Sequence, residues 1–349
     1  GTHKTPTYAD SGYIFLSSKN VTSGEIDWDN VMYIPEELHK ELYQRVAPQK
    51  DDILLAKNGT TGVAALVDKE EIFDIYVSLA LIRPDKNKII PKYLLYAINS
   101  ESSKRYFDSH LKGVGVPNLH LTHIRETPIS VPDFHTQEEI IKRLDKVSDL
   151  IAKRRQQLEK LDLLVKARFV EMFGDPVYNS KGLPTERGID FFKLSNGKFV
   201  PENKRFESGI PAYGGNGISW YTNDSIIQND TLVVGRVGFQ SGNVHFVKGP
   251  LWVTDNAMYI SYYNAEKYDL QFLYALMEHI DFTRFQDAGD LKKITQKPFM
   301  NMEYIRPTLL QQKEYVSFFE RTGEAKRTIS ESLAKLETLK KALMQEYFR

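Results

Sequence analysis

Residues 157–173 read QLEKLDLLVKARFVEMF, and residues 332–348 read SLAKLETLKKALMQEYF. Placed one above the other, these stretches share leucine, lysine, alanine, glutamate and phenylalanine at matching positions, with an offset of 175 residues. No gap is needed as far back as Gln137, which falls on Gln312. A repeat with so long a period concerns the whole architecture of a chain. The two stretches predict a pair of similar long helices, at roughly 135–173 and 310–349.

The first of these stretches has the periodicity of a helix that needs a partner. Glu138 and Glu139 suit the positive end of a helix dipole, which makes Thr136 the expected N-cap. The stretch meets neither proline nor glycine before Gly174-Asp175-Pro176. At 1.5 Å per residue the helix would be roughly 55 Å long, and so long an apolar seam requires a second helix. That seam is formed by Ile140, Leu144, Val147, Ile151, Leu158, Leu161, Val165 and Met172.

The chain before each long helix reads as a mixed α/β segment. In the first segment, short apolar runs separated by polar, glycine-rich turns predict strands. These strands are expected at 13–16, 52–56, 63–67, 77–82 and 129–131. Pro91 opens a predicted helix that extends towards Phe107, because proline suits the first turn of a helix.

Residues 176–308 repeat this order. The strand and glycine turn at 230–238 match 51–62, and Gln271–Leu276 match Tyr93–Ile98. An insertion at about 25–45 in the first copy accounts for most of the change in offset. The second copy has some 30 residues before Gly209 and the first has 11 before Gly12, so we expect the first copy to be clipped at its N-terminus.

We therefore predict α/β (α+β) units in tandem duplicate, separated by two long helices that form an antiparallel coiled coil with pseudo-two-fold symmetry. The expected boundaries are 1–134 for the first unit, 135–175 for the central helix, 176–308 for the second unit and 309–349 for the last helix.

Composition excludes several classes of protein. The 349 residues are ample for about two domains. With 46 basic and 46 acidic residues the net charge is zero, so any DNA affinity must come from local basic loops or be shared with a partner. There is no cysteine, which excludes disulfides and cysteine-ligated zinc and fits a reducing compartment. We find no membrane span and no signal peptide, and we expect a cytoplasmic protein.

The duplicated blocks carry a family resemblance. They are 132–140 and 158–175, with weaker second copies at 307–312 and 333–348. In these blocks the chain resembles the specificity (S) subunit of type I restriction–modification enzymes. The resemblance implies two target recognition domains, at 1–134 and 176–308, each of which reads one half of a bipartite, asymmetric site in double-stranded DNA. It also implies that the helices are a spacer on which methyltransferase (modification) subunits, two of them, and restriction/translocase subunits dock.

Candidate DNA contacts lie in the glycine turns, because side chains on loops can reach base edges and phosphates. The first turn offers Lys57, Asn58, Thr60 and Thr61, and the second offers Arg236, Gln240 and Ser241. The loops with Lys112, Asn118, Lys292 and Lys293 come next, and Lys19, Tyr213 and Asn216 follow. Plain hairpin turns and solvated loops would have the same composition, and the turn at 213–217 is of a kind that is more often structural.

The sequence lacks the motifs of an enzyme. We find no amino-methylation motif, S-adenosylmethionine loop, P-loop, nuclease core or metal-spaced histidines, so we expect no catalytic residue, cofactor or metal. Two other functions remain open. One is a stand-alone DNA-binding adaptor, or the recognition part of a split methylation and cleavage enzyme. The other is a coiled-coil interaction scaffold without a DNA role, which the neutral charge favours.

Overall fold

The chain folds into two compact units in the computed structural model, which describes residues 6–111 and 117–349. Unit 1 consists of Gly1–Gln156 and Ser330–Arg349, and unit 2 consists of Gln157–Ile329. Two long helices, α5 (Phe134–Phe173) and α9 (Leu309–Tyr347), each contribute one part to unit 1 and the other part to unit 2. Their bounds agree with the expected helices within two residues.

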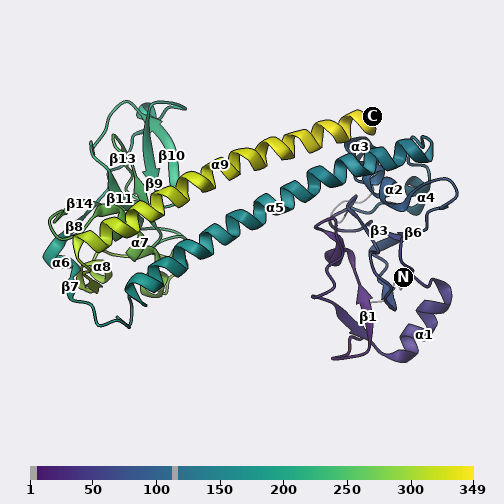
Figure 1. The fold of residues 1–349 in the computed structure, drawn as a ribbon, viewed down its shortest axis with the longest axis horizontal. Coiled ribbons are helices and arrows are strands. Elements are labelled where there is room, and N and C mark those ends of the chain that lie inside the picture. The colour runs from purple at the N-terminus through teal and green to yellow at the C-terminus, as the bar shows by residue number, and fades with distance from the viewer. Residues whose placement is uncertain (1–5, 112–116) are drawn as a thin grey trace. The chain divides into compact units, whose positions relative to one another are not determined.

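Unit 1 contains two three-stranded sheets (Figure 1). In the first sheet, β1 (Tyr13–Leu16) pairs antiparallel with β2 (Met32–Ile34) and parallel with β5 (Phe73–Ile75). In the second sheet, β3 (Ile53–Ala56) pairs antiparallel with both β4 (Ala64–Leu66) and β6 (Leu79–Ile82). The two sheets share one apolar cluster, so they form a single layered body. The strands expected at 13–16, 52–56, 63–67 and 77–82 are confirmed, each to within a residue or two at its ends.

The helices of unit 1 are shorter than expected. The helix predicted from Pro91 towards Phe107 is two helices, α2 (Pro91–Ile98) and α3 (Glu101–Ser109). The break has a clear cause. Ser100 is buried, and its hydroxyl donates to the Ala97 carbonyl while accepting from the Ser103 N–H, so it caps a new helix. The remaining helices are α1 (Glu36–Arg45), the five-residue α4 (Leu121–Arg125) and the short 3₁₀ helix Ser18–Val21.

Unit 2 contains a three-stranded sheet with the same connections as the first sheet of unit 1. Strand β9 (Ile210–Gly214) pairs antiparallel with β10 (Gly217–Thr222) and parallel with β13 (Trp252–Val253). Both central strands follow a glycine with positive φ, Gly12 at 144° and Gly209 at 127°. A Cβ atom there would lie 2.5 Å from the Ile34 carbonyl oxygen in unit 1 and 2.9 Å from the Thr222 carbonyl oxygen in unit 2. The neighbouring strand thus requires glycine at the same place in both units.

The other sheet of unit 2 has four strands. Its order is β12 (Val244–Val247), β11 (Thr231–Gly235), β14 (Ala257–Tyr263) and β8 (Phe192–Asn196). The first three strands correspond in pairing and direction to β4, β3 and β6 of unit 1. Strand β8 has no such counterpart among the described residues of unit 1. A two-stranded sheet and two short helices complete the unit around α7 (Leu270–Glu278): β7 (Thr185–Arg187), β15 (Glu303–Ile305), α6 (Gly188–Phe191) and α8 (Lys297–Asn301).

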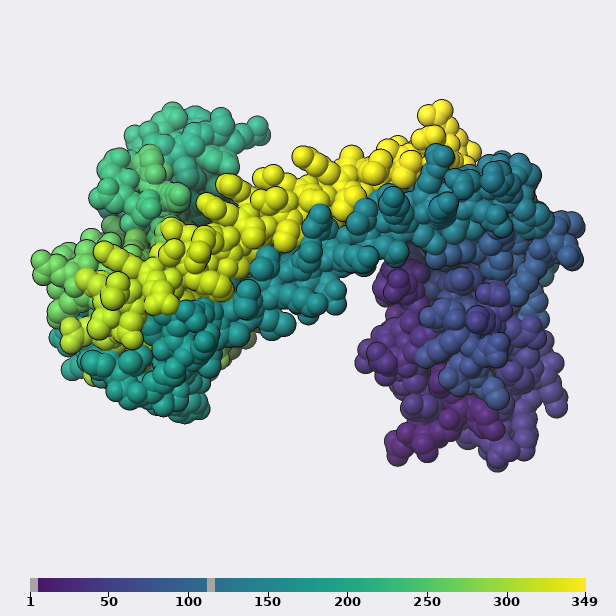
Figure 2. Space-filling view, in the orientation of Figure 1, coloured from purple at the N-terminus to yellow at the C-terminus, as the bar shows by residue number. Residues whose placement is uncertain are grey.

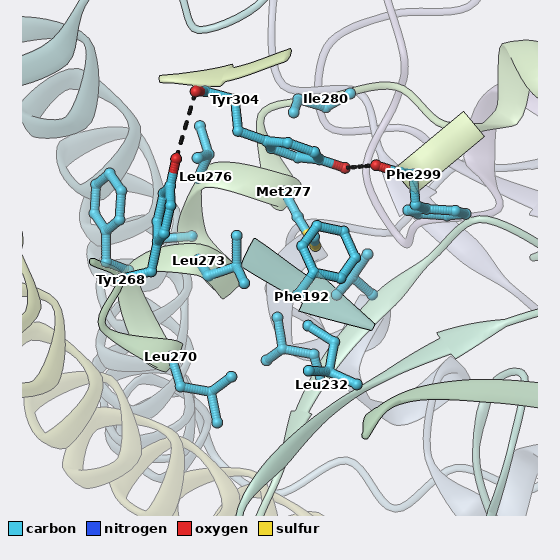
Figure 3. Packing of buried hydrophobic residues seen from close by; sticks show 14 of the residues in the cluster. Phe192, Leu232, Tyr268, Leu270, Leu273, Leu276, Met277, Ile280, Phe299 and Tyr304 are labelled. Atoms are coloured by element: carbon cyan, nitrogen blue, oxygen red, sulfur yellow. Dashed lines mark hydrogen bonds between the residues drawn. The ribbon is translucent and has the colours of Figure 1, made fainter. Parts of the chain in front are cut away.

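The core of unit 2 is rich in aromatic side chains. Figure 3 shows Tyr304 and Tyr268 inside it, beside leucines of α7. The Tyr304 hydroxyl donates to the Phe299 carbonyl at 3.0 Å, and the Tyr268 hydroxyl donates to the Tyr304 carbonyl at 3.5 Å. Burial raises the pKa of both phenols well above the ordinary range, so both stay protonated and act as donors.

The two long helices close the cores of both units in the same way. In unit 1, Ile140 and Leu144 near the start of α5 pack with Phe348, which follows the end of α9. In unit 2, Tyr315 and Val316 near the start of α9 pack with Phe173, the last residue of α5. The side chains of α5 and α9 therefore lie against each other within each unit (Figure 2).

Charged pairs also join the two long helices within each unit. Arg155 pairs with Glu337 at 2.7 Å in unit 1, and Arg168 pairs with Glu314 at 2.8 Å in unit 2. Arg155, Glu337 and Glu314 are exposed and Arg168 is half-buried, so water screens both pairs and each contributes little stability.

A buried glutamine fixes the start of each long helix. Gln137 is fully buried, and its amide oxygen accepts from the Ile90 N–H at 2.8 Å. Its amide nitrogen donates to the carbonyls of Lys88 and Pro132, at 3.2 and 2.8 Å. Gln312 makes the same three bonds in unit 2, to the Asp269 N–H and the Lys267 and Pro307 carbonyls, at 2.8, 2.9 and 2.9 Å. Each glutamine thus ties its long helix to the residue that precedes α2 or α7.

These bonds correct the expected alignment of α2 with α7. Ile90 and Asp269 donate to the equivalent glutamines, so these two residues correspond to each other. Tyr93 therefore corresponds to Phe272, whereas the sequence alignment places Tyr93 opposite Gln271. Ring contacts agree. Tyr93 lies 5.2 Å from Phe348, and Phe272 lies 5.1 Å from Phe173, measured between ring centroids.

Two further expectations are wrong. The N-cap of α5 is Asp133 and not Thr136, because the Asp133 carboxylate accepts from the Thr136 N–H at 3.0 Å. Residues 129–131 form no strand. The Ser130 carbonyl there accepts from the Tyr93 hydroxyl at 2.9 Å, so a side chain takes the place of a strand partner.

The glutamine bonds lead to a stability prediction. Gln137→Ala would leave three backbone groups without partners, at about 1–3 kcal/mol per buried group, so we expect unit 1 to lose at least about 2 kcal/mol. Gln312→Ala should do the same to unit 2. Hydrogen exchange during denaturant titration measures each unit separately, and Glu138→Ala, an exposed neighbour, is the control. Equal stability of Gln137→Ala and Glu138→Ala would contradict the prediction.

Candidate nucleic-acid interface

The two glycine turns share one backbone frame. We call residues 57–62 turn 1 and residues 236–242 turn 2. In turn 1, the Lys57 N–H donates to the Ser78 carbonyl at 2.9 Å, and the Gly62 N–H donates to the Ala56 carbonyl at 2.8 Å. In turn 2, the Arg236 N–H donates to the Asn256 carbonyl at 2.9 Å, and the Gly242 N–H donates to the Gly235 carbonyl at 2.8 Å. Turn 1 follows β3 and turn 2 follows β11, which are corresponding strands.

Each turn is held against one of the predicted basic loops. In unit 1, Asn58 bridges to Asn118, and the Leu119 N–H donates to the Lys57 carbonyl at 2.8 Å. In unit 2, Val237 bridges to Lys293, and the Ile294 N–H donates to the Arg236 carbonyl at 3.0 Å. Candidate residues from separate parts of the chain are therefore neighbours in both units.

The basic residues at the start of the turns differ in their surroundings. Burial lowers the pKa of the half-buried Lys57 ammonium below its ordinary value, and a phosphate beside it would restore that pKa. In unit 2 the Arg236 guanidinium donates to the Asp255 carbonyl at 3.1 Å, which orients the side chain. Both positions therefore present a cation beside a turn apex.

Amide side chains add hydrogen-bonding capacity in unit 1. The side-chain oxygens of Asn58 and Asn118 are buried and have no hydrogen-bond partner among the described residues. Paired amide donors and acceptors are the groups that recognise adenine in the major groove. Asn58 and Asn118 are half-buried as residues, and both stay base-reading candidates of this unit.

The structure separates the other candidates by exposure. Thr60, Gln240 and Lys293 are exposed, while Thr61 and Lys292 are half-buried. Ser241 is fully buried, and its hydroxyl has no partner among the described groups, so the expectation of a DNA contact there is wrong for this conformation. Lys112 lies outside the described residues.

Three lower-ranked candidates lie away from the turns. Lys19 is exposed on the 3₁₀ helix after β1. Asn216 is exposed between β9 and β10. Tyr213 packs against a buried cluster of unit 2 that includes Val233, and burial raises the pKa of its phenol. Tyr213 is a structural residue here.

Sequence reasoning missed two exposed apolar residues beside turn 2. Phe239 is 90% exposed at the apex of the turn, and Leu291 is 56% exposed on the adjoining loop. The available signal was an aromatic residue directly after Gly238 in an otherwise polar turn.

Comparisons with known proteins agree with the resemblance stated from the sequence. Residues 7–161 match the family model described as the type I restriction modification DNA specificity domain. A putative type I restriction enzyme MjaX specificity subunit of Methanocaldococcus jannaschii is 24% identical over 336 residues, which cover 86% of this chain and 78% of that protein. A putative type I specificity subunit of Mycoplasma pneumoniae is 23% identical over 266 residues, which cover 73% of this chain and 69% of that protein.

The chain is similar to type I specificity subunits over most of its length. Its fold agrees with that of a solved S subunit. The S subunit of a type I restriction–modification system from M. genitalium superposes with a TM-score of 0.64 at 15% identity, over 98% of this chain and 90% of that one.

The described residues also bear on metal sites and membrane spans. Among residues 6–111 and 117–349, no group of three histidine, cysteine, aspartate or glutamate side chains could hold a metal ion. No helix in those ranges is long and apolar enough to cross a membrane.

Neighbouring residues in turn 2 yield a testable prediction. Ser241→Ala removes a buried hydroxyl without a partner, so DNA binding should be unchanged and stability unchanged or higher by up to about 1 kcal/mol. Gln240→Ala removes an exposed amide, and binding should weaken. Titration of DNA with each variant of the full chain measures both. A stronger defect in Ser241→Ala than in Gln240→Ala would contradict this reading of the turn.

Proposed function

We propose that this chain is the DNA sequence-specificity subunit of a type I restriction–modification complex. Unit 1 and unit 2 contain the two target recognition domains, at 1–134 and 176–308, and each reads one half of a bipartite, asymmetric site in double-stranded DNA. The subunit is non-catalytic and needs no cofactor. Two methyltransferase subunits and the restriction/translocase subunits, which supply the chemistry, assemble on it.

One observation carries this proposal. Turns 1 and 2 share the backbone bonds at their two ends, lie against the same kind of loop and follow corresponding strands, although turn 2 is one residue longer. Their side chains nevertheless differ at nearly every position, with Lys57, Asn58 and Thr60 in one and Arg236, Val237 and Phe239 in the other. Two domains that recognise different half-sites require the same backbone arrangement with different polar side chains on it.

A tandem duplication with an antiparallel coiled coil belongs to the proposal as well. Support comes from the paired glutamines Gln137 and Gln312, and from the paired aromatic residues Phe173 and Phe348, each set 175 positions apart. Asp162 and Glu337 are also 175 positions apart, and each pairs with a basic residue of the other long helix, Lys326 and Arg155 respectively. The helices retain these residues because their role is geometric.

Half-site binding tests the proposed reading. Lys57→Ala should weaken binding to one half-site and Arg236→Ala to the other, by about 1–3 kcal/mol where the lost contact is to a base. Loss of a phosphate contact should instead reduce the slope of the logarithm of the binding constant against the logarithm of salt concentration by about one. The target comes from methylome sequencing of a host that carries the system. Duplexes with one half-site scrambled then report on each unit.

Matched controls lie at the opposite ends of the same strands. Lys86 pairs with Asp51 before the start of β3, and Lys248 follows β12 beside the start of β11. Lys86→Ala and Lys248→Ala should bind DNA as the unchanged chain does. Equal sequence discrimination by all four variants would refute the assignment of the turns. A chain with no discrimination at all, alone or with its methyltransferase subunits, would favour a scaffold without a DNA role.

The proposed spacer role of α5 and α9 has its own test. Inserting seven residues in each helix at positions 175 apart keeps the apolar face in phase, because a heptad is close to two helical turns. We expect the preferred number of base pairs between the half-sites to increase. Selection from a library of duplexes with variable spacers measures it. An unchanged spacer would show that the helices do not set the distance.

A further inference from the structure

We propose that Phe239, with Leu291 beside it, is an apolar wedge that enters a base-pair step in the half-site read by unit 2. The inference rests on the proposed function and adds a specificity-determining device to it. Apolar side chains inserted between base pairs unstack one step and bend the duplex, so the energy of bending becomes part of recognition.

Exposure is the first observation. Phe239 is 90% exposed, the highest value among the large hydrophobic side chains in the part of the chain that the structure describes. Most aromatic side chains in unit 2 serve its core, as Phe169, Phe192 and Phe272 do. Phe239 is not used by the core, and its ring at the apex of the turn is available for contact with a ligand.

The base of the wedge is rigid. The Gln286 side-chain amide donates to the carbonyls of Phe239 and Ser241, at 3.3 and 2.7 Å. The Gly238 N–H donates to the Lys292 carbonyl at 2.8 Å. Gly242 has a φ of 99°, and a Cβ atom there would lie 3.2 Å from Phe282, so the turn is also packed against the unit. Because the base is already fixed, little of the binding free energy of the ring is lost in ordering the turn. More of it is therefore available to unstack a base step.

Leu291 and Phe239 flank the backbone pairing of turn 2 with its loop. Val237 bridges antiparallel to Lys293, the Gly238 N–H donates to the Lys292 carbonyl, and Phe239 and Leu291 are the next residues of the two segments. Both residues are exposed. The turn and loop therefore present two apolar side chains at one edge of the unit.

Charge around the wedge favours DNA over a protein partner. Residues 236–242 and 287–294 carry three basic side chains, Arg236, Lys292 and Lys293, against two acidic ones, Asp287 and Asp290. Gln240 follows Phe239 and is exposed. Proteins that insert a side chain into a groove of DNA combine an apolar residue with nearby cations and amides, because phosphates line both sides of the groove. Turn 2 and its loop have this composition.

Unit 1 has no such tip in turn 1. The residue that corresponds to Phe239 is Thr60, since Asn58 and Val237 make the equivalent bridges. A threonine is too short to open a base step. The two half-sites should therefore differ in DNA distortion, with unstacking in the half-site of unit 2 and little in that of unit 1.

Fluorescence of 2-aminopurine, which rises when the base is unstacked, tests the wedge. The full chain with its methyltransferase subunits is bound to duplexes that carry the probe at successive positions of each half-site, and the Arg236→Ala defect identifies the half-site of unit 2. We expect increased fluorescence at one step of that half-site. Phe239→Ala should abolish the increase and weaken binding about tenfold, as loss of one aromatic–base stack does. Phe239→Trp should retain both.

The control is Tyr178→Ala, because Tyr178 is 83% exposed in unit 2 outside turn 2 and should have no effect. An unchanged signal in Phe239→Ala, with sequence discrimination intact, overturns the wedge and leaves the proposed function standing. Failure of the unchanged complex to discriminate its target from a scrambled duplex overturns the proposed function itself. Weaker association of Phe239→Ala with the methyltransferase subunits in the absence of DNA, with fluorescence unchanged, assigns Phe239 to a protein contact and overturns the wedge.

Discussion

Each unit depends on an aromatic side chain that arrives at the end of a long helix. Phe173 completes the core of unit 2 at the end of α5, and Phe348 completes the core of unit 1 after α9. Burial of a phenylalanine contributes roughly 2–3 kcal/mol, a large share of the stability of a small unit. Two properties of the long helices are therefore constrained, the periodicity of their apolar residues and their exact length. The length is constrained because the terminal phenylalanine must reach the core that it completes.

The buried glutamines and the turn frames share a physical principle. Backbone groups are the same at every position of a chain, so bonds between them can be repeated in two units whose side chains differ. Gln137 and Gln312 bond only backbone atoms, and so do the contacts that define turns 1 and 2. Side chains on these frames are free to vary without loss of the fold, which is the condition for two recognition surfaces with unlike chemistry.

The long helices and the main strands could be predicted because each leaves a periodic or repeated signal. The pairing of each turn with its loop could not, because a backbone bond between distant segments leaves no pattern in the sequence. The failures have specific causes. Thr136 looked like an N-cap because acidic residues follow it, but Asp133 bonds its N–H first. The helix break at Ser100 depends on the burial of its hydroxyl. The burial of Ser241 depends on a loop distant in sequence, where the Gln286 side-chain amide donates to the Ser241 carbonyl. Phe239 was missed because composition counts an aromatic residue as core, and only coordinates show it in solvent.

The route of the chain also orders the steps of biosynthesis. Unit 1 contains Gly1–Gln156, which are made before unit 2, yet it also includes Ser330–Arg349 and buries Phe348. Unit 2 ends at Ile329. On the ribosome, the segment made second can therefore finish folding before the segment made first. An interrupted chain that lacks its last turns would leave Tyr93 and its neighbours open to solvent, where chaperones and proteases recognise apolar surface.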